Sequence, residues 1–205
     1  MKGRYRYDEY NSEVSANLAF VPALARCLQQ IGARRVFEVG CGNGSVANAL
    51  AAKGYEIVGV DPSESGITEA NRCFPHLRLQ CADGYDDLGT RFGLYEAVVS
   101  VEVIEHMYDP RLFLRRCFEL LKPSGTLLLT TPFHGYWKNL AIALLGRMDA
   151  HWNPLWDGGH IKFWSERTLR AVLLETGFQN VKFRRLGRVA PLAKSMLAVA
   201  SRPGA

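Results

Sequence analysis

The sequence contains, at residues 36–45, the stretch Val36-Phe37-Glu38-Val39-Gly40-Cys41-Gly42-Asn43-Gly44-Ser45. Its first four residues are apolar except for Glu38, a pattern typical of a buried strand that carries an acid close to its end. Three glycines follow at alternate positions, and glycine allows a tight turn and a close approach of another molecule to the backbone. From Ser45 the composition is helical, and a helix N-terminus offers unpaired N–H groups to a ligand. The stretch therefore predicts a strand, a ligand-binding turn and a helix.

Length and composition are ordinary for one globular domain. The chain has 205 residues, of which 48% are hydrophobic and 22% charged, and a formal net charge of +5. This charge is compatible with anionic substrates, nucleic acid or acidic lipid, and it identifies none of them. The five cysteines are scattered without a C-x-x-C pair, which argues against a disulfide framework or a zinc ribbon. Without a signal-like apolar start or an apolar run of about 18 residues, we expect a cytoplasmic protein.

Short apolar strands alternate with helical segments along the chain. Strands are expected at residues 35–39, 55–60, 77–81, 97–101, 126–130, 181–186 and 195–200, and helices at 18–31, 44–53, 64–74, 110–121 and 165–175. This alternation predicts an α/β fold with a doubly wound, mostly parallel sheet, which ends in an antiparallel strand pair at one edge. We expect a single domain over residues 1–205. Residues 1–34 would form an N-terminal lid or helix, and residues 132–164 an insertion that shapes the acceptor pocket.

Acidic residues follow the predicted strands at the edge where such sheets bind ligands. Asp61 lies about 20 residues after Gly40, where dinucleotide-binding folds place an acid that accepts hydrogen bonds from ribose. A dehydrogenase is therefore one interpretation. Against it, the glycine spacing is G-x-G-x-G, a further acid (Asp83) follows the third strand, and Glu38 would face a pyrophosphate unfavourably.

These elements together resemble class I S-adenosylmethionine-dependent methyltransferases, from about Val36 to the C-terminus. The resemblance implies a Rossmann-like, seven-stranded sheet of order 3-2-1-4-5-7-6 and S-adenosylmethionine as cofactor. In that family the acid that matches Asp61 binds ribose hydroxyls, and the one that matches Asp83 meets the adenine amino group. A carboxylate such as Glu38 suits the ammonium group of this cofactor. The implied cofactor site contains Glu38, Gly40, Cys41, Gly42, Gly44, Asp61, Pro62, Asp83, Gly84 and Val101.

The segment Glu102-Val103-Ile104-Glu105-His106 follows the fourth strand. If it forms a helical turn, Glu102, Glu105 and His106 share one face. Two carboxylates and an imidazole suit a divalent metal. A histidine with a pKa near neutrality suits a general base equally well. Both interpretations stay open at this point.

The same segment is similar to two methyltransferase subfamilies. The ubiquinone-pathway O-methyltransferases share the Glu-Val-Ile-Glu-His type of segment followed by Asp109-Pro110. The RNA 3′-terminal 2′-O-methyltransferases use the same segment with a later histidine, in a string that Gly159-His160-Ile161-Lys162-Phe163-Trp164 resembles with one residue displaced. This resemblance implies a metal site of Glu102, Glu105, His106 and His160. Other small-molecule methyltransferases carry Glu-His here without metal, to shape the pocket or hold the cofactor.

The sequence indicates the acceptor site less specifically than the cofactor site. His106, His134 and Glu105 are the candidate catalytic residues, because a hydroxyl acceptor must be deprotonated. The apolar segment 137–148 has basic ends and suits either a packed helix or a peripheral contact with a membrane or a hydrophobic acceptor. Aromatic side chains suit an apolar or aromatic pocket, or ordinary core packing: Tyr5, Tyr10, Tyr136, Trp137, Trp152, Trp156 and Trp164.

We therefore expect methyl transfer from S-adenosylmethionine to a hydroxyl of a small organic acceptor. One alternative is metal-dependent 2′-O-methylation of an RNA 3′ end, although the basic cluster of Arg184, Arg185 and Arg188 is small for a nucleic-acid surface. A different alternative is a cofactor-binding partner subunit without catalysis. The sequence leaves the acceptor, the metal and the oligomeric state open.

Overall fold

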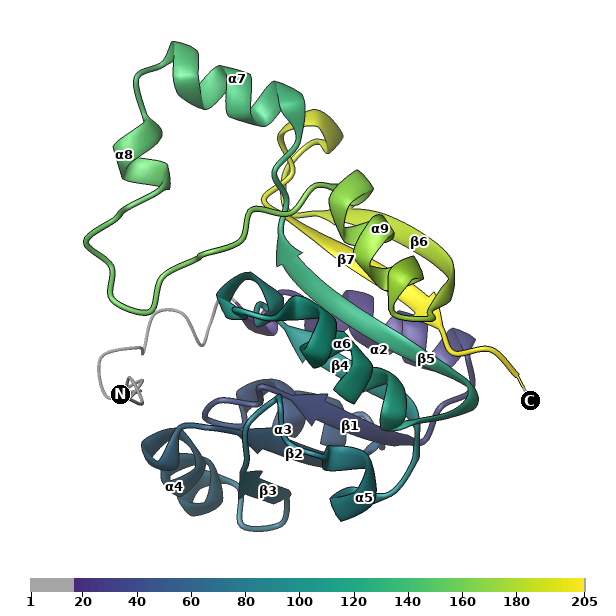
Figure 1. Ribbon diagram of the computed structural model, residues 1–205. Coiled ribbons are helices and arrows are strands. Elements are labelled where there is room, and N and C mark those ends of the chain that lie inside the picture. Colours follow the sequence, from purple (N-terminus) through teal and green to yellow (C-terminus); the bar gives the residue numbers. More distant parts are fainter. Residues whose placement is uncertain (1–16, 205) are drawn as a thin grey trace.

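Seven strands form one twisted sheet in the computed structural model, which describes residues 17–204 (Figure 1). The strand order is β3-β2-β1-β4-β5-β7-β6. All neighbouring pairs are parallel except those of β7, which runs antiparallel to both β5 and β6. The predicted fold class and strand order are thus confirmed. The strands are β1 Arg35–Val39, β2 Glu56–Asp61, β3 Arg78–Cys81, β4 Tyr95–Val101, β5 Leu121–Pro132, β6 Gln179–Leu186 and β7 Ser195–Ser201.

Helices cover both faces of the sheet. The α-helices are α2 Val21–Gln30, α3 Ser45–Ala51, α4 Glu64–Cys73, α5 Leu88–Phe92, α6 Pro110–Glu119, α7 Tyr136–Leu144, α8 Met148–His151 and α9 Glu166–Glu175, and two 3₁₀ turns are η2 Ile104–His106 and η3 Ala190–Leu192. Three of the predicted helices begin at a side-chain cap that the sequence offers. The side chains of Ser63, Asp109 and Ser165 accept hydrogen bonds from the first turns of α4, α6 and α9. Helices α5 and α8 were not predicted.

The sheet separates two hydrophobic cores, because successive strand residues point to opposite faces. Phe37 and Val39 of β1 belong to the core under α5, α6 and α9, whereas Val36 belongs to the core under α2, α3 and α4. In β4, Val98 faces the first core, and Val99 faces the second. Because both faces are covered, the central strands are apolar throughout, as a parallel sheet requires.

Strand β5 begins earlier than predicted. The run Lys122-Pro-Ser-Gly was expected to separate helix and strand, but α6 ends at Glu119 and β5 already pairs with β4 at Leu121. Between the pairs Tyr95–Leu121 and Ala97–Thr126, residues 122–125 stand opposite Glu96. Such an irregularity accommodates Pro123, which has no N–H to donate, and Ser124, whose φ is +63°.

Residues 1–16 of the predicted N-terminal lid or helix (1–34) lie outside the described residues, and the rest contains α2. The insertion after β5 is observed. Residues 135–163, here called the arm, carry α7 and α8 away from the sheet and return to α9 (Figure 1). The backbone N–H of His134 donates to the carbonyl of Trp164 (2.9 Å), which joins the two ends of the arm. No helix among the described residues is long and apolar enough to cross a lipid bilayer.

Candidate functional site

The glycine turn after β1 is held against the end of β2. The N–H groups of Gly40 and Cys41 both donate to the carbonyl of Val60, at 2.8 and 2.9 Å. Gly40, Gly42 and Gly44 have positive φ angles of 83°, 53° and 79°. A Cβ atom added at Gly40 would overlap the side chain of Val103. The turn therefore needs glycine both for its backbone conformation and for its close approach to the segment after β4.

Asp61 fixes this turn from the end of β2. Its two carboxylate oxygens accept hydrogen bonds from the N–H groups of Gly42 and Ser63, both at 2.9 Å. Burial raises the pKa of Asp61, the two backbone hydrogen bonds oppose this rise, and the charge of Asp83 adds to it. Each carboxylate oxygen retains acceptor capacity, so Asp61 can hold the turn and still accept hydrogen bonds from ligand hydroxyls.

Glu38 lies beneath the turn with 1% of its surface exposed, and its Oε2 atom has no hydrogen-bond partner within residues 17–204. Burial, and then the charge of Asp61, raises the pKa of Glu38 to about 8. A buried carboxyl group is costly unless a cation or a donor meets it. An orphaned acid under a glycine turn that a Cβ atom would fill therefore fits a ligand with a positively charged group.

The remaining predicted cofactor residues lie along the same edge of the sheet. Asp83 and Gly84 follow β3, Pro62 follows β2, and Val101 ends β4. Asp83 is exposed, and its side chain accepts a hydrogen bond from the N–H of Tyr85 (3.0 Å). The buried Cys41 belongs to the turn itself, and burial raises its pKa.

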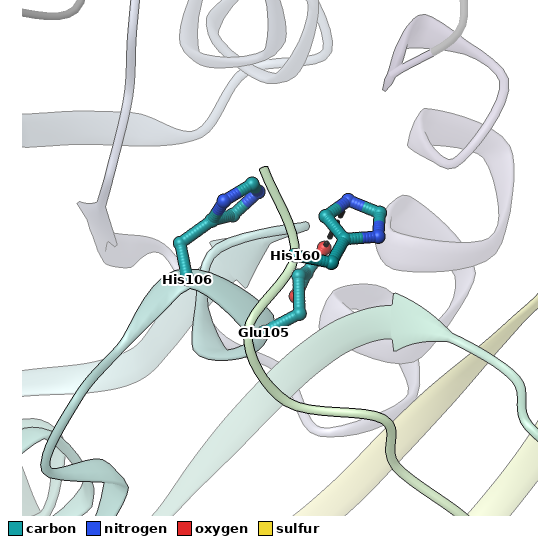
Figure 2. Close-up of side chains that lie close together, drawn as sticks. All are labelled: Glu105, His106 and His160. Carbon is teal, nitrogen blue, oxygen red and sulfur yellow. Dashed lines mark ion pairs between the residues drawn. The ribbon is translucent and has the colours of Figure 1, made fainter. Parts of the chain in front are cut away.

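Glu105, His106 and His160 form a second cluster, after β4. One potential ligand atom from each lies within 4.8 Å of the others, and Figure 2 shows the two imidazole rings above the Glu105 carboxylate. His160 Nε2 is 3.9 Å from Glu105 Oε1, and the ring centroids of His106 and His160 are 4.8 Å apart. The structure therefore brings together three of the four residues that the sequence assigned to a metal.

Backbone hydrogen bonds position this cluster. The carbonyl of Glu105 accepts from the N–H groups of Ile161 and Lys162, both at 2.9 Å, which fixes the returning end of the arm beside η2. His106 Nδ1 lies 2.9 Å from the carbonyl oxygen of Gly158, so in the neutral ring Nδ1 carries the proton and donates it to this carbonyl. Thr131 Oγ1 donates to Glu105 Oε2 at 2.9 Å.

Burial favours the neutral form of all three groups. It raises the pKa of Glu105, with a further contribution from Glu102. It lowers the pKa of His106, although hydrogen bonds to the backbone of Gly158 and Gly159 oppose the shift. Burial and the neighbouring His106 lower the pKa of His160 to about 4. Two neutral imidazoles, with a carboxyl group that would give up its proton to a cation, form a donor set that suits a first-row divalent cation, so these residues fit a metal.

Glu102 is not part of this cluster, and the prediction that it shares a helical face with Glu105 and His106 is wrong. The 3₁₀ turn starts only at Ile104, and Glu102 has a left-handed φ of +54°. Its N–H donates to the carbonyl of Thr130 (3.2 Å), which continues the pairing of β4 with β5. Burial raises the pKa of Glu102 to about 7, and hydrogen bonds to Thr130 and Ser195 and the charges of Lys194 and Lys138 oppose the rise.

His134 lies at the base of the arm, apart from the Glu105 cluster. Its ring packs against His151 (5.6 Å between centroids), Trp152 (6.3 Å) and Phe163 (5.1 Å). We call these four residues the arm-base cluster. His151 and Phe163 were not singled out from the sequence, because no spacing pattern relates them to His134. Their proximity arises only when the arm folds back.

The predicted aromatic pocket residues do not gather in one place, and Trp152 belongs to the arm-base cluster. Trp156 packs on His106 and His160, at 6.1 and 5.2 Å between ring centroids. Trp164 is buried, whereas Tyr136 and Trp137 are exposed on α7. Tyr5 and Tyr10 lie outside the described residues.

Comparisons with known proteins agree with this geometry. A family model described as "Methyltransferase domain" matches residues 7–182. A ubiquinone biosynthesis O-methyltransferase of Caulobacter vibrioides is 34% identical over 172 residues, which cover 76% of this chain and 67% of the relative. One of Bradyrhizobium diazoefficiens is 33% identical over 125 residues, which cover 59% and 48%. The chain thus spans about half to two thirds of the length of these relatives.

Two solved structures share the fold. The methyltransferase domain of bacterial CtHen1 superposes with a TM-score of 0.70 and 22% identity, covering 92% of this chain and 99% of that one. Magnesium protoporphyrin IX methyltransferase from Synechocystis, with bound SAH, superposes with a TM-score of 0.69 and 19% identity, covering 98% and 90%.

Proposed function

The chain belongs to the methyltransferase-domain family, and from this we propose that it transfers the methyl group of S-adenosylmethionine to a hydroxyl of a small organic acceptor. The observation that carries the proposal is the orphaned Glu38 beneath the glycine turn, on the same strand-end edge as the Glu105–His106–His160 cluster. One site suits a cationic cofactor, and the other suits deprotonation of an acceptor.

The cofactor supplies a methyl group that positive sulfur has already activated. In this proposal Glu38 meets its ammonium group, Asp61 its ribose hydroxyls and Asp83 its adenine amino group. The backbone of Gly40, Cys41, Gly42 and Gly44 approaches it closely, and Pro62, Gly84 and Val101 complete the walls. The named relatives of Caulobacter and Bradyrhizobium support an oxygen acceptor, since their names state O-methylation.

In this proposal His106 acts on the acceptor hydroxyl. As the O–CH₃ bond forms and the S–CH₃ bond breaks, the hydroxyl proton passes to a base and the sulfur leaves as a neutral thioether. In this proposal the His106 ring accepts the proton, because its lowered pKa keeps it neutral, and the Nδ1 atom beside the Gly158 carbonyl oxygen orients the ring. Glu105 orients the cluster through its carboxylate and its carbonyl. His134 stays a second candidate base.

A divalent cation at Glu105, His106 and His160 is the alternative arrangement of the same site. Held there, a cation would lower the pKa of a bound hydroxyl, and His106 would then be a ligand and not the base. This arrangement also favours the second candidate function, 2′-O-methylation of an RNA 3′ end. The specific observation is that His160 joins Glu105 and His106 across the fold.

Transfer of a labelled methyl group tests the proposal. We expect the protein to label at least one member of a panel of small hydroxylated acceptors, and His106→Gln to lower kcat by about 100-fold or more while the cofactor Kd stays constant. His76→Gln is the matched control, since His76 is exposed and lies before β3. If methyl transfer is lost in the presence of a chelator and is restored by a divalent cation, the cluster holds a metal as in the alternative arrangement.

Three outcomes separate the alternatives. Full activity in chelator excludes an essential metal. Protection of an RNA 3′ end against periodate oxidation, without labelling of small acceptors, replaces the first function by the second. Cofactor binding without turnover on any acceptor contradicts both and supports a partner subunit that does not catalyse.

A further inference from the structure

The outer end of the arm is an ordered turn. Helix α7 ends at Leu144, and Gly146, with a left-handed φ of +62°, turns the chain toward α8. The N–H groups of Gly146 and Arg147 donate to carbonyls in the last turn of α7, at 3.1 and 3.0 Å. We call residues 144–149 the arm tip. Because backbone hydrogen bonds close this turn, the arm tip presents its side chains in a defined arrangement.

Three large apolar side chains of the arm tip are exposed. Leu144 has 79% of its surface exposed, Leu145 68% and Met148 41%. Single exposed leucines are ordinary, but a group of large apolar side chains on an ordered turn is typical of a surface that another molecule covers. Figure 1 shows the turn between α7 and α8 on the side of the arm away from the sheet. The arm tip is therefore placed to meet a second molecule.

The exposed charges of the outer arm argue against a lipid surface as the occupant. The segment 137–148 has a basic residue near each end, but the structure buries one of them. Lys138 has 9% of its surface exposed, and its Nζ donates to the carbonyl of Phe133 at 2.8 Å. The exposed acidic and basic side chains of residues 136–157 are Arg147, Asp149 and Asp157. An anionic bilayer attracts clusters of basic residues, so a surface with one cation and two anions suits it poorly.

The charges of the arm tip are complementary to those of a second copy of the same tip. Arg147 and Asp149 have opposite charges and lie on either side of Met148, at the start of α8. In a two-fold contact the same patch faces itself, so Arg147 of each copy can meet Asp149 of the other, and the ion pair forms twice. We propose that the arm tip is the centre of a two-fold interface between two copies of this chain, with its three apolar side chains between these ion pairs.

The apolar surface continues from the arm tip along α7. Trp137 and Leu144 are seven residues apart, so they lie on one face of the helix, and both are exposed. Each partner in an interface of standard size contributes about 20–30 residues, and the outer arm, residues 136–157, is long enough to supply them. Aromatic side chains and methionine are the types enriched in such interfaces. The interface goes beyond the proposed function and does not depend on methyl transfer.

Analytical ultracentrifugation of the whole chain in lipid-free buffer tests the interface. We expect a concentration-dependent equilibrium between monomer and dimer. Leu144→Asp should weaken association about 20-fold or more, because each dimer would bury two unpaired carboxylates. Leu174→Asp is the matched control and should leave the dissociation constant unchanged, since Leu174 is a half-exposed leucine on α9. A monomer at every concentration up to about 0.5 mM, or a dimer that Leu144→Asp leaves intact, overturns the interface.

Charge reversal tests whether the arm tip pairs with a second copy of itself. Arg147→Asp and Asp149→Arg should each weaken the dimer about tenfold, because each change creates two contacts between like charges. The variant with both changes again has opposite charges at the two positions, so its dissociation constant should return to within about threefold of wild type. A double variant that associates as weakly as the single variants contradicts the two-fold pairing.

Trypsin and vesicles give two independent readouts. At a protein concentration well above the dissociation constant, cleavage after Arg147 should be about fivefold slower or more than in dilute protein, because the second copy covers this bond. Cleavage after Lys53, which is exposed in the turn before β2, is the control and should not change. A monomer that binds vesicles of phosphatidylcholine and phosphatidylglycerol, and loses this binding in Leu144→Asp, would assign the arm tip to a lipid surface and overturn the interface.

Discussion

Glu38 is a buried acid whose Oε2 atom has no hydrogen-bond partner within residues 17–204. It is placed by β1, whose alternate residues Phe37 and Val39 fill one core, and only 1% of its surface is exposed. Its pKa of about 8 lies far above its ordinary value of 4.5. Between these two pH values the folded protein holds a proton that the unfolded chain has released. Raising the pH across this window therefore favours the unfolded chain.

Glu38→Gln should remove this pH dependence. The free energy of unfolding of wild type should fall relative to the variant by up to about 1.4 kcal/mol per pH unit between pH 5 and 8. Urea unfolding at several pH values measures the difference. Glu64→Gln, on the exposed surface of α4, is the control and should show no such trend. Parallel curves for wild type and Glu38→Gln would contradict a raised pKa.

The strand, turn and helix of residues 35–51 form the element that the cofactor proposal depends on. The turn is fixed from β2 by Asp61 and the Val60 carbonyl, and from the β4 end by Val103 beside Gly40. The irregular backbone at Glu102 belongs to the same junction. Two effects therefore require glycine at position 40: its positive φ angle and its contact with Val103. A comparison with a glycine that has only the first of these can separate them.

Gly40→Ala and Gly54→Ala make a matched pair. Both glycines have positive φ, +83° and +91°, but a Cβ atom at Gly54 has open space whereas one at Gly40 meets Val103. Each should lose about 1 kcal/mol from backbone strain. Gly40→Ala should lose a further 1–3 kcal/mol from overpacking and bind S-adenosylmethionine at least tenfold more weakly. Denaturant unfolding and calorimetry measure both, and equal losses at the two positions would show that Val103 adapts freely.

The whole molecule assembles its candidate site from distant parts of the chain. The core sheet supplies Glu38, Asp61 and the end of β4, while the arm returns to supply His160 and the partner carbonyl of His106. The arm also carries large exposed apolar side chains at its outer part: Leu144, Leu145, Met148 and Leu155. In the proposed function, the sheet edge would bind the cofactor and the arm would contribute to the acceptor site.

Limited trypsin digestion should separate these two functions. Among the described residues we expect early cleavage after Arg147, which is exposed between α7 and α8. The nicked protein should keep its S-adenosylmethionine affinity within about threefold and lose most acceptor methylation, because the sheet is intact and the arm is not. Mass spectrometry locates the cut, and Arg147→Gln is the control that should resist it. Loss of cofactor binding in step with cleavage would show that the arm supports the glycine turn.

Much of the fold follows from local signals in the sequence. Alternation of apolar strands with capped helices predicts the doubly wound sheet, and the family resemblance supplies the strand order that the structure has. The acids at the ends of β1, β2 and β3 lie on one edge because parallel strands all end on the same side of a sheet. For these acids the position in the sequence is enough to predict the location in the fold, because each lies at or directly after the end of its strand.

The acceptor side needed the tertiary structure. The i, i+3, i+4 spacing predicted that Glu102 shares a helical face with Glu105 and His106. Instead, the backbone of Glu102 continues the β4–β5 pairing, and the 3₁₀ turn begins only at Ile104. His160 reaches Glu105, and His151 reaches His134, only because the arm folds back and is held by backbone hydrogen bonds. Short-range periodicity contains no information about where a long insertion returns. The sequence by itself determines the sheet and the edge on which the cofactor is proposed to bind, and long-range backbone pairing determines which side chains face the acceptor.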